Sequence, residues 1–268
     1  MTAPVVLFRS DHHSVEELEV CDQYFDTYDL RSRCPPNSLV IGRYSCLPYY
    51  DELDRDLRCA GSRLINTPAQ HHWIANFDYY DTVRNYTPKS YTNNNFYTCQ
   101  YPGPFVIKGR TNSRKSAWKR LMFARTKIDA LLKACDLTDD PEIASQGVIY
   151  REFIEFKNFG HDLSGVPITN EWRFFCYKQT VLSWGFYWAN LDEIPAGAEI
   201  DQAGHDFVRM LTTLVSPHVN AYVLDIAQKP DGSWMLVEIN DLQQSGLSWN
   251  DPHTFYKNLK AALETDRG

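Results

Sequence analysis

The sequence predicts an α/β fold followed by an α+β fold with antiparallel sheets, and two patterns support this prediction. Apolar strand-like runs alternate with helical segments over residues 1 to about 85, which is typical of a small unit with a parallel sheet. From residue 105 onward, strand-like runs follow one another with few helices between them. A chain of 268 residues with 43% hydrophobic content can bury a large core, in one domain or in a few smaller lobes.

Helix-capping residues mark the elements of the first part. Strands are expected at residues 4–8, 38–43 and 63–66, and helices within residues 14–28, 48–61 and 67–83. Ser14, with Glu17 three positions later, is a capping-box pattern. Thr67, followed by Pro68 and Gln70, gives the same signal for the third helix. A parallel sheet with attached helices is therefore expected.

The rest of the chain is expected to be richer in strands. Residues 86–104 are polar and contain many turn-forming residues, so a linker or long loop is expected there. Residues 117–137 fit either one long helix or a strand over 119–123 followed by a helix from Thr126. The other expected elements are strands at 105–110 and 147–156, a hairpin at 171–188 turning at Lys178–Gln179, and helices at 204–215 and 251–264.

Residues 221–241, AYVLDIAQKPDGSWMLVEIND, predict a hairpin with an acid in the middle of each apolar strand. Asp231–Gly232 is typical of a two-residue type I′ turn, and with that turn Asp225 lies directly opposite Glu238. Asn240 then shares their face. Two carboxylates and an amide oxygen suit Mg²⁺. The alternative is a solvated face, which the apolar neighbours of both acids disfavour.

Cations inside apolar strands suggest an anionic ligand. Lys108 lies in PFVIKGR, and the following loop, GRTNSRKS, supplies donors for phosphate oxygens but lacks the GxxxxGK[ST] pattern of a P-loop. Arg173 lies in NEWRFF, and its planar guanidinium suits a phosphate or a carboxylate. The alternatives are a solvated basic turn for the loop and, for Arg173, a salt bridge to Glu171 or Glu155.

Composition excludes several classes of partner. The net charge of −7 argues against broad nucleic-acid binding, although a local basic pocket for a phosphate stays compatible with it. No apolar run is long enough to span a membrane, and the N-terminal residues do not resemble a signal peptide. The seven cysteines are scattered without a CxxC pair, which favours reduced thiols and a cytoplasmic location. Neither His12–His13 nor His71–His72 is expected to form a shared metal site, because adjacent helical side chains point apart.

In this order along the chain, VIKGR…SRKS, REFIEF, EWRFF and LDIAQKPDGSWMLVEIND resemble the ATP-grasp family. The last segment is the most specific, since it looks like the metal-binding hairpin of carboxylate–amine ligases in that family. The pattern is most similar to a clade of small ATP-grasp proteins often classed only as domains of unknown function. The loop after Lys108 departs from many relatives, because it has Arg and Lys and a single glycine where they are glycine-rich.

The resemblance implies an ATP-grasp fold, in which two α+β lobes with antiparallel sheets enclose ATP. It implies an N-terminal α/β pre-ATP-grasp domain at residues 1–88, a small lobe at 89–155, and a C-terminal lobe with the metal-binding hairpin at 156–268. It also favours a strand and then a helix over residues 118–135.

The resemblance further implies roles for individual residues. Catalysis would rest on Arg173 and Lys108. ATP would contact Lys108, Arg110, Ser113 and Lys115 through its phosphates, Glu152, Phe153 and Ile154 through its adenine, and Glu155 through its ribose. One or two Mg²⁺ ions would be held by Asp225, Glu238 and Asn240. Arg43, at the end of a strand in the first domain, would hold a substrate carboxylate; the alternative is a surface arginine.

The resulting hypothesis is an ATP- and Mg²⁺-dependent ligase. Phosphorylating a carboxylate gives it a leaving group that an amine can displace, which needs positioning, metals and cations more than a protein nucleophile. The expected partners are a small-molecule or peptide substrate with a carboxylate and an amine, without nucleic acid or membrane. Two alternatives are a non-ligating, nucleotide-dependent assembly chaperone or binding module with a protein client, and an α/β protein whose buried charges are internal salt bridges.

Overall fold

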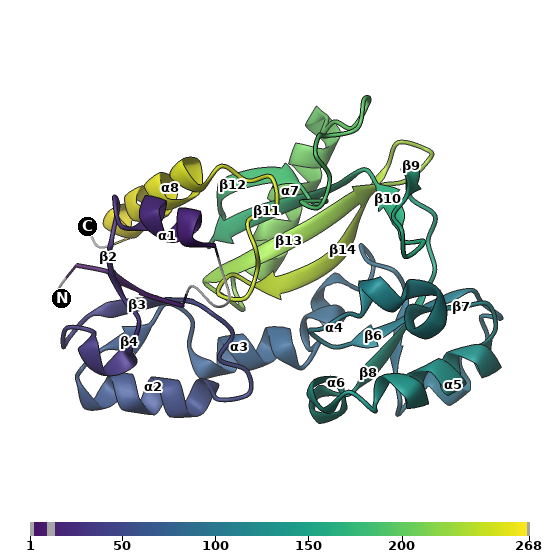
Figure 1. Ribbon diagram of the computed structural model, residues 1–268, viewed down its shortest axis with the longest axis horizontal. Coiled ribbons are helices and arrows are strands. Elements are labelled where there is room, and N and C mark those ends of the chain that lie inside the picture. Colours follow the sequence, from purple (N-terminus) through teal and green to yellow (C-terminus); the bar gives the residue numbers. More distant parts are fainter. Residues whose placement is uncertain (1–2, 10–13, 267–268) are drawn as a thin grey trace.

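A four-stranded parallel sheet forms the N-terminal part of the protein in the computed structural model, which describes residues 3–9 and 14–266 (Figure 1). This N-terminal sheet has the order β2-β1-β3-β4, with β1 (Val5–Phe8), β2 (Asp26–Tyr28), β3 (Leu39–Arg43) and β4 (Arg63–Leu64). The accompanying helices are α1 (Val15–Cys21), α2 (Tyr50–Cys59), α3 (Pro68–Ala75) and α4 (Tyr79–Val83). The predicted α/β beginning of the chain is confirmed.

Two of the expected helices are shorter than predicted. The helix expected over 14–28 ends at Cys21, and β2 follows it as an edge strand that pairs in parallel with β1. The helix expected over 67–83 is divided into α3 and α4, because Phe77 has φ of 67° and cannot continue a right-handed helix. Its start is as predicted: Thr67 and Gln70 form a reciprocal capping box.

A second, antiparallel sheet, here called the middle sheet, has the order β5-β8-β6-β7. Its strands are β5 (Ser90–Thr92), β6 (Phe105–Gly109), β7 (Phe123–Ala124) and β8 (Val148–Glu152), and its helices are α5 (Lys127–Leu137) and α6 (Pro141–Gln146). β5 corrects the expectation that residues 86–104 form only a linker. The strand expected at 119–123 is instead a π-helical turn, Trp118–Met122, with the short strand β7 after it.

The third sheet, here called the C-terminal sheet, is antiparallel with the order β12-β11-β13-β14. Its strands are β11 (Glu171–Tyr177), β12 (Thr180–Phe186), β13 (Ala221–Gln228) and β14 (Trp234–Asp241), and α7 (Gln202–Val215) and α8 (Pro252–Thr265) pack on it. A short ribbon, β9 (Asn158–His161) and β10 (Pro167–Thr169), was not predicted. The β11–β12 turn at Lys178–Gln179 is confirmed, since Tyr177 pairs with Thr180.

Successive residues of β11 point to opposite faces of the C-terminal sheet and so build two cores. Phe174 packs in a cluster with Leu211 and other apolar side chains of α7. Phe175 packs in a cluster with Phe255 of α8 and with apolar residues of the N-terminal sheet. Arg173 and Glu171 lie on the same face as Phe175, two and four residues away, where α8 no longer covers the sheet. This face therefore continues from a hydrophobic core into a polar site.

The turn between β13 and β14 differs from the prediction, yet the two acids still meet. The Lys229 N–H donates to the Ser233 carbonyl over 2.8 Å, and the Gly232 N–H donates to the Lys229 carbonyl over 2.9 Å. The loop is therefore one residue longer than a type I′ turn, with Gly232 at φ of 85°. A bulge at Val237 compensates: Ile226 pairs with Leu236, whereas Asp225 pairs with Glu238.

No helix among residues 3–9 and 14–266 is long and apolar enough to cross a membrane.

Candidate functional site

A cleft of about 720 Å³ lies between the middle sheet and the C-terminal sheet. Its walls come from β6 and the loop after it, from residues 151–156, and from β11 and β14. Most of the residues predicted to form a site line this cleft: Lys108, Arg110, Ser113, Lys115, Glu152, Phe153, Ile154, Glu155, Arg173, Glu238 and Asn240. Asp225 and Arg43 are not among its lining residues.

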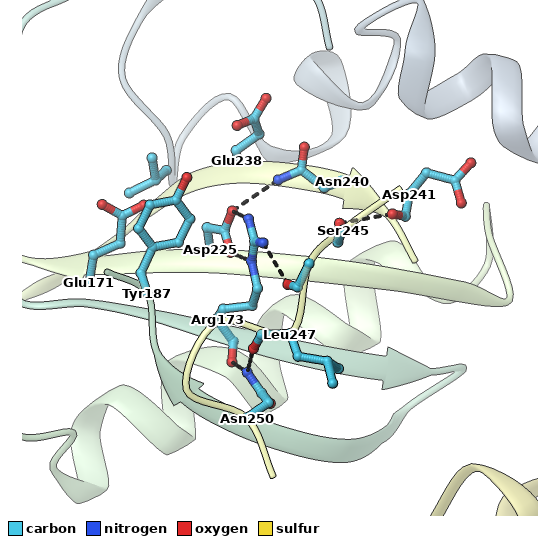
Figure 2. Close-up of polar contacts among 12 residues, drawn as sticks. Glu171, Arg173, Tyr187, Asp225, Glu238, Asn240, Asp241, Ser245, Leu247 and Asn250 are labelled. Atoms are coloured by element: carbon cyan, nitrogen blue, oxygen red, sulfur yellow. Dashed lines mark hydrogen bonds and ion pairs between the residues drawn. The ribbon is translucent and has the colours of Figure 1, made fainter. Parts of the chain in front are cut away.

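Asp225 and Glu238 are paired across the hairpin, but each carboxylate has its own cation. The Arg173 Nε and Nη2 atoms donate to the two Asp225 carboxylate oxygens, each over 2.8 Å (Figure 2). The Asn240 amide adds a third hydrogen bond to Asp225, over 2.9 Å. Asp225 is 1% exposed, so it lies beneath the cleft surface and holds Arg173 and Asn240 in place. The alternative of a salt bridge from Arg173 to Glu171 or Glu155 is not what the structure shows.

Glu238 pairs with Lys108 from the opposite wall, and this ion pair joins the two sheets across the cleft. Burial lowers the pKa of Lys108 below its usual value, and the adjacent carboxylate only partly opposes this effect. Burial alone would raise the pKa of Glu238, but the Lys108 ammonium outweighs it and the pKa is lowered. Alternation along β6 explains the placement, since Ile107 faces α5 while Lys108 faces the cleft.

The oxygens that could hold a hard cation are those of Glu238 and Asn240, which both line the cleft. Within the described residues there is no group of three or more His, Cys, Asp or Glu side chains arranged to bind a metal. The donor chemistry fits a Mg²⁺ ion that takes these two side chains and completes its shell with oxygens of a ligand. Direct coordination by Asp225 would require it to give up a hydrogen bond from Arg173 or Asn240.

The loop after β6 reaches across the cleft to the C-terminal sheet. Lys115 Nζ donates to the Tyr187 hydroxyl and lies 4.0 Å from the centre of the Tyr187 ring. The Arg173 guanidinium carbon lies 4.8 Å from the centre of the same ring. Tyr187 therefore orders two cations at once. Sequence reasoning missed Tyr187, because an aromatic residue just beyond a strand carries no signal of its own.

Glu171 is a buried carboxylate in the cleft that sequence reasoning treated only as an ion-pair alternative. It precedes Arg173 by two residues and so shares its face of β11. The Thr169 hydroxyl donates to Glu171 Oε2 over 3.2 Å. Burial raises the pKa of Glu171 from 4.5 to about 7, with Lys115 opposing part of the shift. An acid at this spacing in an apolar strand was the available signal.

The segment Glu152–Glu155 forms one end of the cleft. The Glu152 N–H donates to the Lys89 carbonyl over 2.8 Å, and the Phe153 N–H donates to the Pro104 carbonyl over 2.9 Å. Both donors are therefore used within the protein, and a ligand would meet the backbone of residues 154–155 instead. The Phe153 ring packs edge-on against Phe123 at 5.2 Å, which fixes its orientation in the cleft wall.

Arg43 corrects an expectation, because it is 0% exposed and cannot reach a substrate. Its Nη2 atom donates to Glu17 Oε1 over 2.6 Å, and its Nη1 atom donates to the Ser245 carbonyl over 3.0 Å. The Tyr256 hydroxyl donates to the same Glu17 oxygen over 2.7 Å. Arg43 is thus neither a substrate ligand nor a surface residue: it joins the N-terminal sheet, α1, α8 and the segment after β14.

The histidines of α3 point apart, as expected. His71 is buried and contacts the Asp241 carboxylate through Nδ1, while His72 lies 3.0 Å from the Asp51 carboxylate. The Tyr50 ring stacks on His71 with 4.3 Å between centroids, and its hydroxyl donates to Asp241 over 3.2 Å. Tyr50 and Asp241 line the end of the cleft nearest α3. His12 and His13 lie outside the described residues.

Comparisons with known proteins add a family match and several structural matches. The model of a family described as an ATP-grasp domain, the third family of its clade, matches residues 97–259, which is more than half of the chain. No curated protein matches the sequence.

The structural matches extend over nearly the whole chain. D-cycloserine synthetase DcsG is 11% identical, with 98% of this chain and 100% of that chain covered and a TM-score of 0.61. ATP-grasp ligase PsnB, complexed with precursor peptide PsnA2 and AMPPNP, is 14% identical, with 100% and 99% covered and a TM-score of 0.58. Another PsnB structure contains a phosphomimetic variant of a minimal precursor, Mg and ADP. The RimK domain protein from Sphaerobacter thermophilus DSM 20745 is 11% identical, with 96% and 99% covered and a TM-score of 0.58. At these identities the likeness is one of fold.

Proposed function

Because the chain belongs to this family of ATP-grasp domains, we propose that it is an ATP- and Mg²⁺-dependent ligase that joins a carboxylate to an amine. The observation that carries this proposal is the cleft itself, where Lys108 on one wall faces Arg173, Glu238 and Asn240 on the other. The sheets on either side are those of an ATP-grasp fold, so the predicted fold is confirmed. The ligase activity and its substrates are proposed on the chemistry of these residues.

In the proposed reaction a carboxylate oxygen attacks the γ-phosphorus of ATP, and the bond to the bridging oxygen of ADP breaks. An amine nitrogen then attacks the acyl carbon, phosphate leaves, and the nitrogen loses a proton. Lys108 and Arg173 would offset the charge on the phosphoryl oxygens. Glu238 and Asn240 would hold Mg²⁺, which neutralises phosphate oxygens when bound. Asp225 would act through Arg173, whose two-point attachment keeps the guanidinium aimed into the cleft.

The substrate class follows from the two ends of the cleft. Adenine would lie against Phe153 and the backbone of residues 154–155, since this end offers an oriented ring and open backbone groups. The carboxylate substrate would then lie beyond Asn240, near Tyr50 and Asp241. PsnB, which shares the fold, binds a precursor peptide, so an amino acid, peptide or protein is the proposed substrate. The seven unpaired cysteines favour a cytoplasmic location for this activity.

The test follows ADP and phosphate release with MgATP and pools of amino acids and peptides, while mass spectrometry searches for a condensation product. A ligase requires release that depends on both a carboxylate and an amine. Lys108→Met should abolish release, and Arg173→Lys should lower kcat because it loses the two-point contact. Lys119→Met is the matched control, since Lys119 is exposed and does not line the cleft.

Ligand-induced stabilisation separates the alternatives. MgATP at 100 times its Kd should stabilise the fold by about 2.7 kcal/mol, because a ligand that binds only the native state shifts unfolding by mass action. Stabilisation without turnover in any pool favours the binding-module alternative. If MgATP leaves the melting temperature unchanged, the proposed nucleotide site is wrong.

A further inference from the structure

One face of α5 exposes apolar side chains that nothing in the described part of the chain covers. Ile128, Leu131 and Leu132 are 72%, 46% and 63% exposed, and Cys135 is also exposed. Their spacing of three, four and seven residues places them on a single stripe of the helix. The opposite side of α5 is occupied, since Ala130, Ala134 and Leu137 pack on the middle sheet. An apolar stripe of this kind marks a protein–protein contact.

The charges at the ends of α5 are placed unfavourably for an isolated helix. Lys127 is its first residue, near the positive end of the helix dipole, and Asp136 lies in its last turn, near the negative end. The Lys127 Nζ atom donates to the carbonyls of Tyr97 and Cys99 over 2.8 and 3.0 Å, which are neutral partners. Asp136 is exposed, and within the described residues no ion pair is formed by its carboxylate. Both charges would gain from a partner helix that runs in the opposite direction.

A second copy of α5 supplies such a partner, because the segment KIDALLKACD is complementary to itself when reversed. With a two-fold axis between Leu131 and Leu132, Lys127 lies opposite Asp136 of the other copy. Ile128 then lies opposite Cys135, and the two leucines meet at the centre. We propose that the chain self-associates through α5, with two copies packed antiparallel across this stripe.

The proposed contact leaves the cleft free. Ile107 of β6 faces α5, whereas Lys108 faces the cleft, so the helix and the cleft lie on opposite faces of the middle sheet. Figure 1 shows α5 on the outer side of that sheet, away from β14. A single pair of short helices covers less than the roughly 800 Å² per partner of a standard interface. The dimer is therefore a weak one, with Kd in the micromolar range, and it is independent of the proposed ligase activity.

Sedimentation equilibrium of the full chain from about 1 to 200 μM tests the proposal, a range chosen to bracket a micromolar Kd. A reversible monomer–dimer equilibrium is expected. Leu132→Glu should raise the Kd by at least about tenfold, since it places an unpaired charge in the contact. Leu163→Glu is the matched control, because Leu163 is fully exposed on the β9–β10 turn and lies outside α5. A monomer at every concentration, or equal effects of the two variants, overturns the proposal.

Thiol cross-linking tests the register. Cys59 and Cys135 are the exposed cysteines among the described residues, so Cys59→Ser leaves a single exposed thiol. In this background Ile128→Cys should form an intermolecular disulfide with Cys135 under mild oxidation. Without Ile128→Cys no dimer should form, because the two Cys135 residues are offset by about 10 Å along the helices at 1.5 Å per residue, beyond disulfide reach.

Two results decide between this register and another. Peptide mapping should find the bridge between the introduced thiol and Cys135, and adding Cys135→Ser should abolish it. A bridge between two Cys135 residues, or no bridge in a variant whose circular dichroism is unchanged, overturns the antiparallel arrangement.

Discussion

Lys108 and Glu238 form the ion pair through which stability and ligand binding can be separated. Both side chains are largely buried, so removing one partner leaves the other charge without compensation. Lys108→Met should lower the free energy of unfolding by about 3 kcal/mol, measured by urea denaturation. It should also abolish the MgATP-induced rise in melting temperature.

The double variant Lys108→Met/Glu238→Gln separates the two effects. It removes both charges and should recover most of the lost stability, because no uncompensated carboxylate remains. The MgATP-induced stabilisation should stay absent. If the double variant is as unstable as Lys108→Met, the loss does not come from the unpaired Glu238.

Glu171 gives the fold a pH dependence of defined sign. Its pKa of about 7 lies above the ordinary 4.5, so between these values the native state binds more protons than the unfolded state. Its contribution to stability is therefore full below pH 4.5 and is lost as the pH rises towards 7. Glu171→Gln keeps a neutral side chain at every pH. Relative to the native sequence, this variant should become more stable by about 3 kcal/mol between pH 4.5 and 8.

Urea denaturation of both proteins across this pH range measures the difference, in which the other titrating groups cancel. Thr169→Val is a useful companion, since it removes the one hydrogen bond to the Glu171 side chain that the described residues supply. A difference between Glu171→Gln and the native sequence that does not vary with pH would show that Glu171 ionises as it does in water.

At the scale of elements, β12 can be tested where a later segment crosses it. Gly185 pairs with Arg173, and a methyl group there would lie 2.3 Å from the Trp249 carbonyl carbon and 2.4 Å from the Asn250 nitrogen. Because both neighbours are backbone atoms, they cannot move aside as a flexible side chain could. Gly185→Ala should cost about 2–3 kcal/mol of unfolding free energy. Gly246→Ala is the control, since its methyl would meet no atom within 4 Å.

Local signals predicted elements well wherever the local chain decides the structure. The Thr67 capping box, the Asp251 cap before Pro252 and the Lys178–Gln179 turn all depend on residues a few positions apart, and all are present. β2 and β5 were missed because each has three residues and exists only through pairing with a distant strand. The break between α3 and α4 at Phe77 has no glycine or proline to indicate it.

The candidate site divides along the same line. Lys108, Arg173 and Glu238 could be found because a charge inside an apolar strand requires a partner, and each of them has one in the structure. The identity of those partners could not be predicted, since Arg173 and Asp225 are 52 residues apart. Arg43 was misjudged for this reason: its strand-end position suggested a substrate ligand, whereas its partner Glu17 lies on α1.

At the scale of the whole molecule, Arg43 holds together parts of the chain that begin and end it. Its contacts reach Glu17 on α1 and the segment after β14, and Tyr256 of α8 completes the cluster. Arg43→Met should lower the free energy of unfolding by about 3–5 kcal/mol, because Glu17 would be left buried without its cation. Folded protein should still bind MgATP with unchanged affinity at low temperature.

Arg43→Met/Glu17→Gln should restore part of that stability, as measured by thermal unfolding followed with tryptophan fluorescence and circular dichroism. The two probes should give one transition in the native sequence, since α1, α8 and the N-terminal sheet share a core with the C-terminal sheet. A selective loss of substrate affinity at unchanged stability would instead restore Arg43 as a substrate ligand.

The bulge at Val237 makes the spacing of the two acids independent of the length of the turn. Below it the pairing follows the loop between Lys229 and Ser233; above it the Val237 carbonyl is held by the Arg151 guanidinium over 2.5 Å, and Asp225 stays opposite Glu238. Residues gained or lost at the exposed tip, Pro230–Gly232, can therefore be absorbed before they reach the cleft. In the history of the chain this tip is free to drift, and for the engineer it is the place to graft a foreign peptide.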